Sequence, residues 1–456
     1  MKQEKQANNS LMPVKVTFRY LPLLLHVLYI LFLASIICSW NFISSVTIGL
    51  IFILGIIKNK VEKGALLENQ FLNIFLIGCI FLYILQLVAL LYTKDFYEGL
   101  RHVQLKTSIA ILPMALYQGN FLDNSVRQKV MRAFVAVLFF VTVYCLLVAL
   151  VTYLKTNESA VFFYHRLVSP LEQHAIQFSI LVFIALVHLL EEARRGAYYV
   201  SPNLHLGASL YFTVFLIILS SKLIIAFFGI YLVYYIIRNL KKANRNRYAI
   251  PIFVLGSVII GALLLFTRNP VTNRFTEIIA GKIEIINADK FTPGMYFNGL
   301  QFRLLQWRFV REILNENHAW LTGVSPGDAQ RLLDQKYIST NMYIGESARG
   351  DRGFLGYNAH NQFLESLLQT GVAGLVAFAI LCAGLIQMAA DVRKTELSAV
   401  VAILLAYALN ESVFETQYGA MIFLFFPVFF YLTYKRSRST QVIGEHQQDA
   451  KFFPKD

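Results

Sequence analysis

Apolar and polar residues follow one another along the chain in long blocks. Apolar runs of about 17–25 residues recur between Leu21 and Tyr434, which is the length of helix that crosses the hydrocarbon core of a bilayer. Because the backbone has to satisfy its own hydrogen bonds in lipid, each run is predicted to be a helix. The pattern predicts about twelve transmembrane helices, at 21–39, 41–57, 71–92, 103–118, 132–154, 174–190, 204–220, 222–238, 249–266, 363–388, 397–413 and 416–434.

One long polar stretch interrupts this series and is the only place where a soluble type of structure is expected. The predicted fold class is therefore an all-α polytopic membrane protein with about twelve transmembrane helices and one large, mainly helical periplasmic loop. The predicted divisions are a cytoplasmic tail (1–20), helices one to nine (21–266), the periplasmic loop (267–362), helices ten to twelve (363–434) and a second cytoplasmic tail (435–456).

Two helices are predicted inside the loop. Residues 302–315 place apolar side chains at Phe302, Leu305, Phe309 and Ile313, which is a helical period. A capping box with proline at the first helical position, at 325–328, predicts the start of a second helix. The segment 339–357 contains four glycines and is predicted to be a loop.

Composition and charge agree with a membrane protein. Only 15% of the residues are charged and 57% are hydrophobic, whereas about a quarter of a soluble domain is charged. The net charge is +14, from 41 Lys and Arg against 27 Asp and Glu. With both termini in the cytoplasm, 24 of these cations lie on the cytoplasmic face, 6 in short outer connections and 11 in the long loop. This partition follows the positive-inside rule and removes the reason to expect nucleic-acid binding.

Cofactor motifs are missing from the sequence. The four cysteines all fall inside predicted spans without a C-x-x-C pair, and no H-E-x-x-H or Walker A motif occurs. We therefore predict no metal and no cofactor, and the informative polar residues face outward.

Three arginines of the first loop helix are the first candidates for chemistry. Arg303, Arg308 and Arg311 lie within three turns of helix. Ion pairing with Glu312 and Glu316 is the simpler interpretation. The functional interpretation is a clamp for a diphosphate, because a guanidinium donates two hydrogen bonds to phosphate oxygens and keeps its charge.

Lys222 and His360 are the other candidates. Lys222 follows two serines between apolar runs, so it either anchors a helix end at the interface or faces a cavity. His360 lies where the loop re-enters the membrane, and either packs at a helix start or deprotonates a hydroxyl at the membrane surface. Two groups in outer connections, at 98–102 and at 165–174, either line the same cavity or are solvated loop charges.

Three motifs in order resemble the O-antigen ligase/polymerase superfamily. They are RLLQW at 303–307, LTGVSPGD at 321–328 and NAHNQFLESLLQTGVAGL at 358–375. The superfamily pattern is R-x-x-x-W, then a G-V-G-P-G-like turn, then H-N-x-x-L followed by T-G-x-x-G-L. The late outer loop extends the resemblance across most of the chain.

The resemblance implies a metal-independent glycosyltransferase of the membrane-embedded, GT-C-like type, in the bacterial inner membrane with its active site in the periplasm. It implies that Arg303 contacts the diphosphate of an undecaprenyl-diphosphate-linked glycan donor and that His360 acts on the acceptor. Lys222 stands where the family usually has arginine, which keeps the charge and loses the two-pronged donor. The predicted substrate-binding residues are Arg303, Lys222, Arg308 and Asn361, and the predicted catalytic residue is His360.

The acceptor stays open within this resemblance. A ligase transfers the glycan to lipid A core, a polymerase to a growing glycan, and a third group of the superfamily to protein; we favour the ligase. A transporter of lipid-linked oligosaccharide is the rival function. It predicts charged residues deep in several spans, and the predicted span centres are nearly free of them.

Overall fold

The fold is built from helices. The computed structural model describes residues 12–61, 73–118, 122–198, 200–240, 283–346 and 350–452, and the predicted span at 249–266 lies outside these ranges. No strand occurs in the described residues, which confirms the all-α class. The α-helices are α1 (Met12–Ile37), α2 (Asn41–Val61), α3 (Ile74–Ala89), α4 (Phe96–Leu105), α5 (Ser108–Tyr117), α6 (Asn124–Thr156), α7 (Tyr164–Val168), α8 (Ala175–Arg195), α9 (Pro202–Ile218), α10 (Lys222–Leu240), α13 (Gly299–Glu316), α14 (Ala329–Ser339), α15 (Gln362–Val392), α16 (Thr395–Ala408) and α17 (Gln417–Phe452).

Seven helices in the described part of the chain are long and apolar enough to cross a membrane: α1, α2, α6, α8, α10, α15 and α17. Helices α3, α9 and α16 are apolar but shorter. On α6, Phe140, Leu147 and Leu154 are exposed while Phe134 and Leu138 are buried. Apolar side chains on both faces of one helix suit a lipid environment. The chain is thus a multi-pass membrane protein, and the number twelve stays a prediction.

The predicted span 103–118 is not one helix. The structure divides it between α4 and α5, which have ten residues each and are separated at Lys106 and Thr107. Ten residues of helix reach about 15 Å, half the thickness of the hydrocarbon core. Lys106 is buried and forms an ion pair with Glu415, so a charge that has its own protein partner divides the apolar run.

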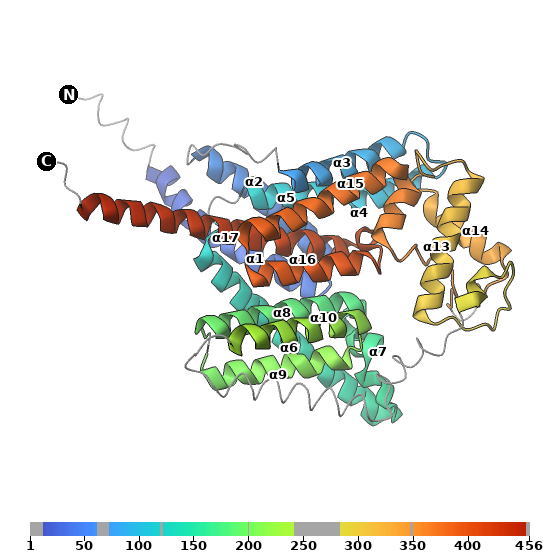
Figure 1. The fold of residues 1–456 in the computed structure, drawn as a ribbon, viewed down its shortest axis with the longest axis horizontal. Coiled ribbons are helices and arrows are strands. Elements are labelled where there is room, and N and C mark those ends of the chain that lie inside the picture. The colour runs from blue at the N-terminus through green and yellow to red at the C-terminus, as the bar shows by residue number, and fades with distance from the viewer. Residues whose placement is uncertain are drawn as a thin grey trace.

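Residues 299–339, called the outer unit after their predicted location, form a small helical unit at one end of the bundle. Figure 1 shows α13 and α14 together at the end away from both chain termini. The predicted helix at 302–315 is confirmed as α13, whose Leu305, Phe309 and Ile313 lie in a separate hydrophobic cluster from that of the membrane helices. The apolar period therefore packs the outer unit, which leaves the opposite face of α13 for polar contacts.

The second predicted helix of this unit begins later than expected. Ser325 has a φ of 84°, and its Oγ accepts a hydrogen bond from the Asp328 backbone at 3.2 Å. Residues 326–328 form a turn, so α14 begins at Ala329. The Asp328 carboxylate accepts from the Lys94 backbone (2.8 Å) and from Arg331 (2.7 Å). Through the Lys94 contact, Asp328 joins the start of α14 to the segment before α4.

Close approach of two helices fixes the position of α15, which carries the outer unit. Helix α15 packs along α3, and both lie side by side in Figure 1. A Cβ added at Gly384 would lie 2.4 Å from the Phe75 backbone of α3. Small residues let membrane helices approach closely and gain packing energy, so this glycine sets the distance between α3 and α15.

We expect Gly384→Ala to destabilise the protein by about 1–3 kcal/mol, because the added methyl group forces backbones apart. The measurement is the thermal unfolding midpoint of the purified protein in detergent. Gly229→Ala in α10 is the matched control, since an added Cβ there meets no atom within 4 Å. Equal midpoints for the two variants would contradict the role of Gly384.

Candidate active site

Arg303 lies in the first turns of α13 and reaches the connection between α16 and α17. A capping box places the start of this helix: the Asn298 side chain accepts from Gln301 N–H (2.9 Å), and Gln301 Oε1 accepts from Asn298 N–H (2.9 Å). The Arg303 guanidinium donates to the Asn410 carbonyl (3.0 Å) and to Glu411 Oε1 (2.6 Å). The arginine therefore links the outer unit to the membrane helices.

His360 approaches the same carboxylate from the other side. It has a φ of 44°, in the left-handed region, and its backbone N–H donates to Asn358 Oδ1 at 3.0 Å. Its Nδ1 lies 2.6 Å from Glu411 Oε2. A carboxylate at Nδ1 fixes the tautomer in which Nε2 accepts a proton. In the described residues Nε2 has no hydrogen-bond partner, so it is the nitrogen available to a substrate.

Glu411 joins the two predicted residues and was missed by the sequence reasoning. Each of its carboxylate oxygens has one partner, Arg303 on Oε1 and His360 on Oε2. Burial alone would raise the pKa of Glu411, but the hydrogen bond and charge of His360 and the charge of Arg303 lower it to about 2. The available signal was an acidic residue in a short connection directly after an apolar run.

Lys222 and Arg303 line the same pocket. The pocket has a volume of about 650 Å³. It lies between the start of α10, α13 and the connection after α16, and its lining includes Tyr164, Tyr296 and Asn410. Lys222 begins α10 two residues after Ser220, whose φ of 54° turns the chain there. Two cations from segments about 80 residues apart thus face one cavity, and Glu411 places His360 beside it.

Arg308 and Asn361 have structural partners instead. Arg308 Nε donates to Glu312 Oε1 at 2.6 Å, and its Nη1 donates to the Ile286 and Ala288 carbonyls. It lines a different pocket, with Trp307. Asn361 caps α15: its Oδ1 accepts from two backbone N–H groups, and its Nδ2 donates to the Leu409 carbonyl at 3.1 Å. Arg303 and Lys222 therefore share one pocket and Glu411 links His360 to Arg303, whereas Arg308 lies at a different pocket and Asn361, next to His360, caps α15.

A second buried carboxylate holds the two loops of the site. Glu365, in the first turn of α15, accepts from the Ala359 backbone (3.1 Å) and from Ser412 Oγ (3.1 Å). One contact lies just before His360 and the other just after Glu411. Glu365 is only 2% exposed, so water does not compete for its hydrogen bonds. These hydrogen bonds fix the separation of the two loops.

The predicted outer group at 98–102 takes part in this support. His102 Nδ1 lies 3.0 Å and Lys106 Nζ 2.8 Å from the Glu415 carboxylate. Burial opposes ionisation of Glu415, but Lys106 and His102 lower its pKa below the usual range. Gln369 donates to both Glu415 (2.9 Å) and Glu365 (2.7 Å). This network connects α4 and α15 behind the His360 loop.

The sequence motifs meet where α15 is broken. Gly371 has φ 66° and ψ −161°, a conformation open essentially only to glycine. The break leaves carbonyls of the preceding turn without helical partners, and those of Leu368 and Gln369 accept from the Val324 and Ser325 backbones at 2.8 and 3.0 Å. The turn at 321–328 therefore docks on the T-G-x-x-G-L segment, which positions the outer unit.

The other predicted outer group borders the pocket. The rings of His165 and His174 lie 4.4 Å apart, and Tyr164, beside them, lines the cavity. In the part of the chain that the structure describes, three or more potential metal ligands converge at one place, His188, Glu192 and Glu396, which belong to α8 and α16 and lie at the other end of the bundle.

The middle of the chain matches a known family. Residues 207–379 match the family model described as O-antigen ligase, and this match includes Lys222, Arg303 and His360. This segment is thus similar to the O-antigen ligase family. This confirms the resemblance to the O-antigen ligase/polymerase superfamily. No curated protein matches the chain. Glu411, which contacts Arg303 and His360, lies beyond the matched segment.

We expect Glu411 to stay ionised at pH 4. An ordinary glutamate, with a pKa near 4.3, is about two-thirds protonated there, whereas a pKa of about 2 keeps this carboxylate charged. The measurement is the infrared difference spectrum between wild type and Glu411→Gln as the pH falls from 7 to 4. The ionised-carboxylate band should persist at pH 4. Its replacement by a protonated carboxyl band above pH 4 would contradict the ion pairs with Arg303 and His360.

Proposed function

We propose that this protein is a glycosyltransferase that moves a glycan from undecaprenyl diphosphate to an acceptor hydroxyl on the outer face of the bacterial inner membrane. One observation carries the proposal: Glu411 joins Arg303 to His360 at the edge of the pocket that Lys222 also lines. The O-antigen ligase match supports the reaction class. The low number of cations in the short outer connections supports the orientation.

The residues have complementary tasks in this reaction. The acceptor oxygen forms a bond to the anomeric carbon of the donor sugar while the bond from that carbon to the diphosphate oxygen breaks. The acceptor proton goes to Nε2 of His360, and Glu411 stabilises the resulting imidazolium through Nδ1–H. The electron pair of the broken bond stays on the diphosphate, whose charge Arg303 and Lys222 stabilise. Neither ATP nor a divalent metal is needed, because the lipid diphosphate is an activated leaving group.

Arg303 suits a binding role despite its pairing with Glu411. Its Nη1 donates to the Gly299 carbonyl at 2.9 Å, and its side chain is 23% exposed. Glu411 holds the guanidinium at the pocket wall before substrate binds, and fixed donors stabilise developing charge more effectively than mobile ones. Glu411 is thus a positioning residue, whereas His360, Arg303 and Lys222 contact substrate.

We expect His360→Ala and Arg303→Ala each to lower the rate of glycan transfer by about 10²–10³-fold, because one loses the base and the other a diphosphate contact. The assay is product formation by the purified protein with an undecaprenyl-diphosphate-linked glycan and its acceptor, in EDTA and without ATP. Arg331→Ala is the control, since that arginine lies 42% exposed on α14 in an ion pair with Asp328. Wild-type rates for both site variants would mean that the assigned site is wrong.

The acceptor that we propose is lipid A core, as in a ligase of lipopolysaccharide biosynthesis. Loss of the protein should then leave finished glycan chains on the lipid carrier. A polymerase, which adds repeat units to a growing glycan, would instead leave single repeat units on the final acceptor. Analysis of the lipid-linked and lipopolysaccharide fractions of a deletion strain distinguishes the two. Single repeats on lipid A core would overturn the ligase assignment and leave the transfer chemistry in place.

A further inference from the structure

A second polar cavity lies at the end of the bundle opposite His360. His360 precedes α15, whereas Arg393 and Lys394 follow it, and 31 residues of helix span about 45 Å. The cavity has a volume of about 690 Å³ and opens between the start of α6, the ends of α8 and α15, and the middle of α17. Its cations are Arg127, Arg195, Arg393, Lys394 and Lys435.

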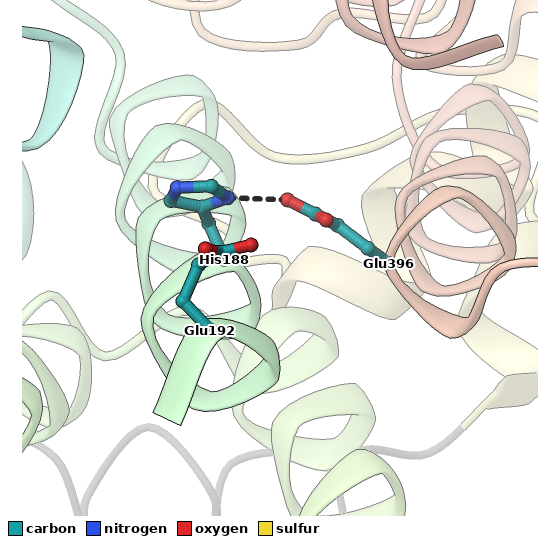
Figure 2. A group of neighbouring side chains, drawn as sticks. All are labelled: His188, Glu192 and Glu396. Carbon is teal, nitrogen blue, oxygen red and sulfur yellow. Dashed lines mark hydrogen bonds and ion pairs between the residues drawn. The ribbon is translucent and has the colours of Figure 1, made fainter. Parts of the chain in front are cut away.

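The floor of this cavity is a buried ion-pair network. Figure 2 shows His188 and Glu192 of α8 facing Glu396 of α16, with His188 Nδ1 2.5 Å from Glu396 Oε1. Arg127 Nη1 lies 3.4 Å from Glu192 and 3.3 Å from Glu396. The Arg127 guanidinium lies between the two carboxylates and neutralises their charge. The three potential ligands therefore form an ion-pair network and not a metal site.

The rim has more positive than negative charge. Arg195 lies 2.5 Å from Glu192, and Lys435 3.3 Å from Asp391, so these cations have acidic partners. Arg393 and Lys394 have none among the described residues. Their side chains therefore leave the cavity with a surplus of charge that a bound anion would neutralise.

The surplus of positive charge in the cavity is concentrated at Lys394. Its Nζ lies 5.8 Å from the centre of the Tyr434 ring, beside which Arg127 and Arg195 also lie, at 4.6 and 5.6 Å. Burial lowers the pKa of Lys394, and the charges of Arg195 and Arg127 lower it further. Three cations around one ring repel one another. The buried Nε of Arg127 has no hydrogen-bond partner in the part of the chain that the structure describes, and it is a further donor.

We propose that this cavity binds the phosphate headgroup of an anionic phospholipid. Basic cavities between membrane helices bind such headgroups, and guanidinium and ammonium groups supply the donors that a phosphodiester accepts. A lipid is favoured over a soluble phosphate because the cavity lies at one end of the apolar spans of α6, α8, α15 and α17, four of the helices that are suited to cross the membrane. This site is independent of glycan transfer at the other end.

The test is lipid binding by the full-length protein in detergent, measured by native mass spectrometry with phosphatidylglycerol and with phosphatidylcholine. We expect phosphatidylglycerol to bind more tightly. Removal of one surface cation weakens the attraction to an anionic lipid about fivefold. Lys394→Gln should show that loss, and Arg393→Gln with Lys394→Gln about 25-fold, with no change for phosphatidylcholine. Thermal unfolding midpoints establish that the variants are folded.

Lys129→Gln is the matched control. Lys129 is an exposed cation on α6, two residues from Arg127, and does not line the cavity. Equal losses for Lys129→Gln and Lys394→Gln would mean general attraction to the surface and would overturn the proposal. A third measurement adds inorganic phosphate. Displacement of phosphatidylglycerol by micromolar phosphate would assign the cavity to a soluble phosphate and would overturn the proposal of a lipid ligand. Retention of the lipid supports it.

Discussion

The outer site depends on a buried carboxylate that has to be neutralised. Glu411 is only 8% exposed, and an ionised group removed from water is stable only with charged or hydrogen-bonding partners. The partners come from two different segments, Arg303 of α13 and His360 before α15. Satisfying one carboxylate therefore fixes an arginine and an imidazole in relation to the pocket. The cost of leaving Glu411 unpaired makes the arrangement of the site part of the stability of the fold.

Two polar networks lie at opposite ends of an apolar bundle. At the outer end Glu365 and Glu415 bind Lys106, His102 and loop backbone groups. At the other end Glu192 and Glu396 bind arginines and a histidine. Between them the helices pack through apolar side chains and close glycine contacts. Polar networks at the ends and apolar packing between them suit a reaction at the membrane surface. The reacting groups stay near water, and the helix bundle supports them rigidly.

The sequence located the substrate-contacting candidates and missed the residues that position them. Arg303, Lys222 and His360 were found from charge, helix ends and motif order. In the structure Arg303 and Lys222 line one pocket, and Glu411 links His360 to Arg303. Arg308 shows the limit of this reasoning: five residues turn a helix by about 140°, so it faces away from Arg303. Glu411 and Glu365 were not found, because their partners lie up to 108 residues away in the chain and no local pattern marks such a pair.

The amino-acid sequence by itself determined the helical class and most helix positions in the described residues. The period of the hydrophobic residues and the need for internal hydrogen bonds depend on neighbouring residues. Helices can therefore be predicted from the local sequence. The division of the segment 103–118 and the late start of α14 were decided by Lys106 and Asp328, which have partners distant in sequence. Only the tertiary structure decided which charges form pairs. A buried charge without a partner is unfavourable, and the partners come from segments that are distant in the sequence.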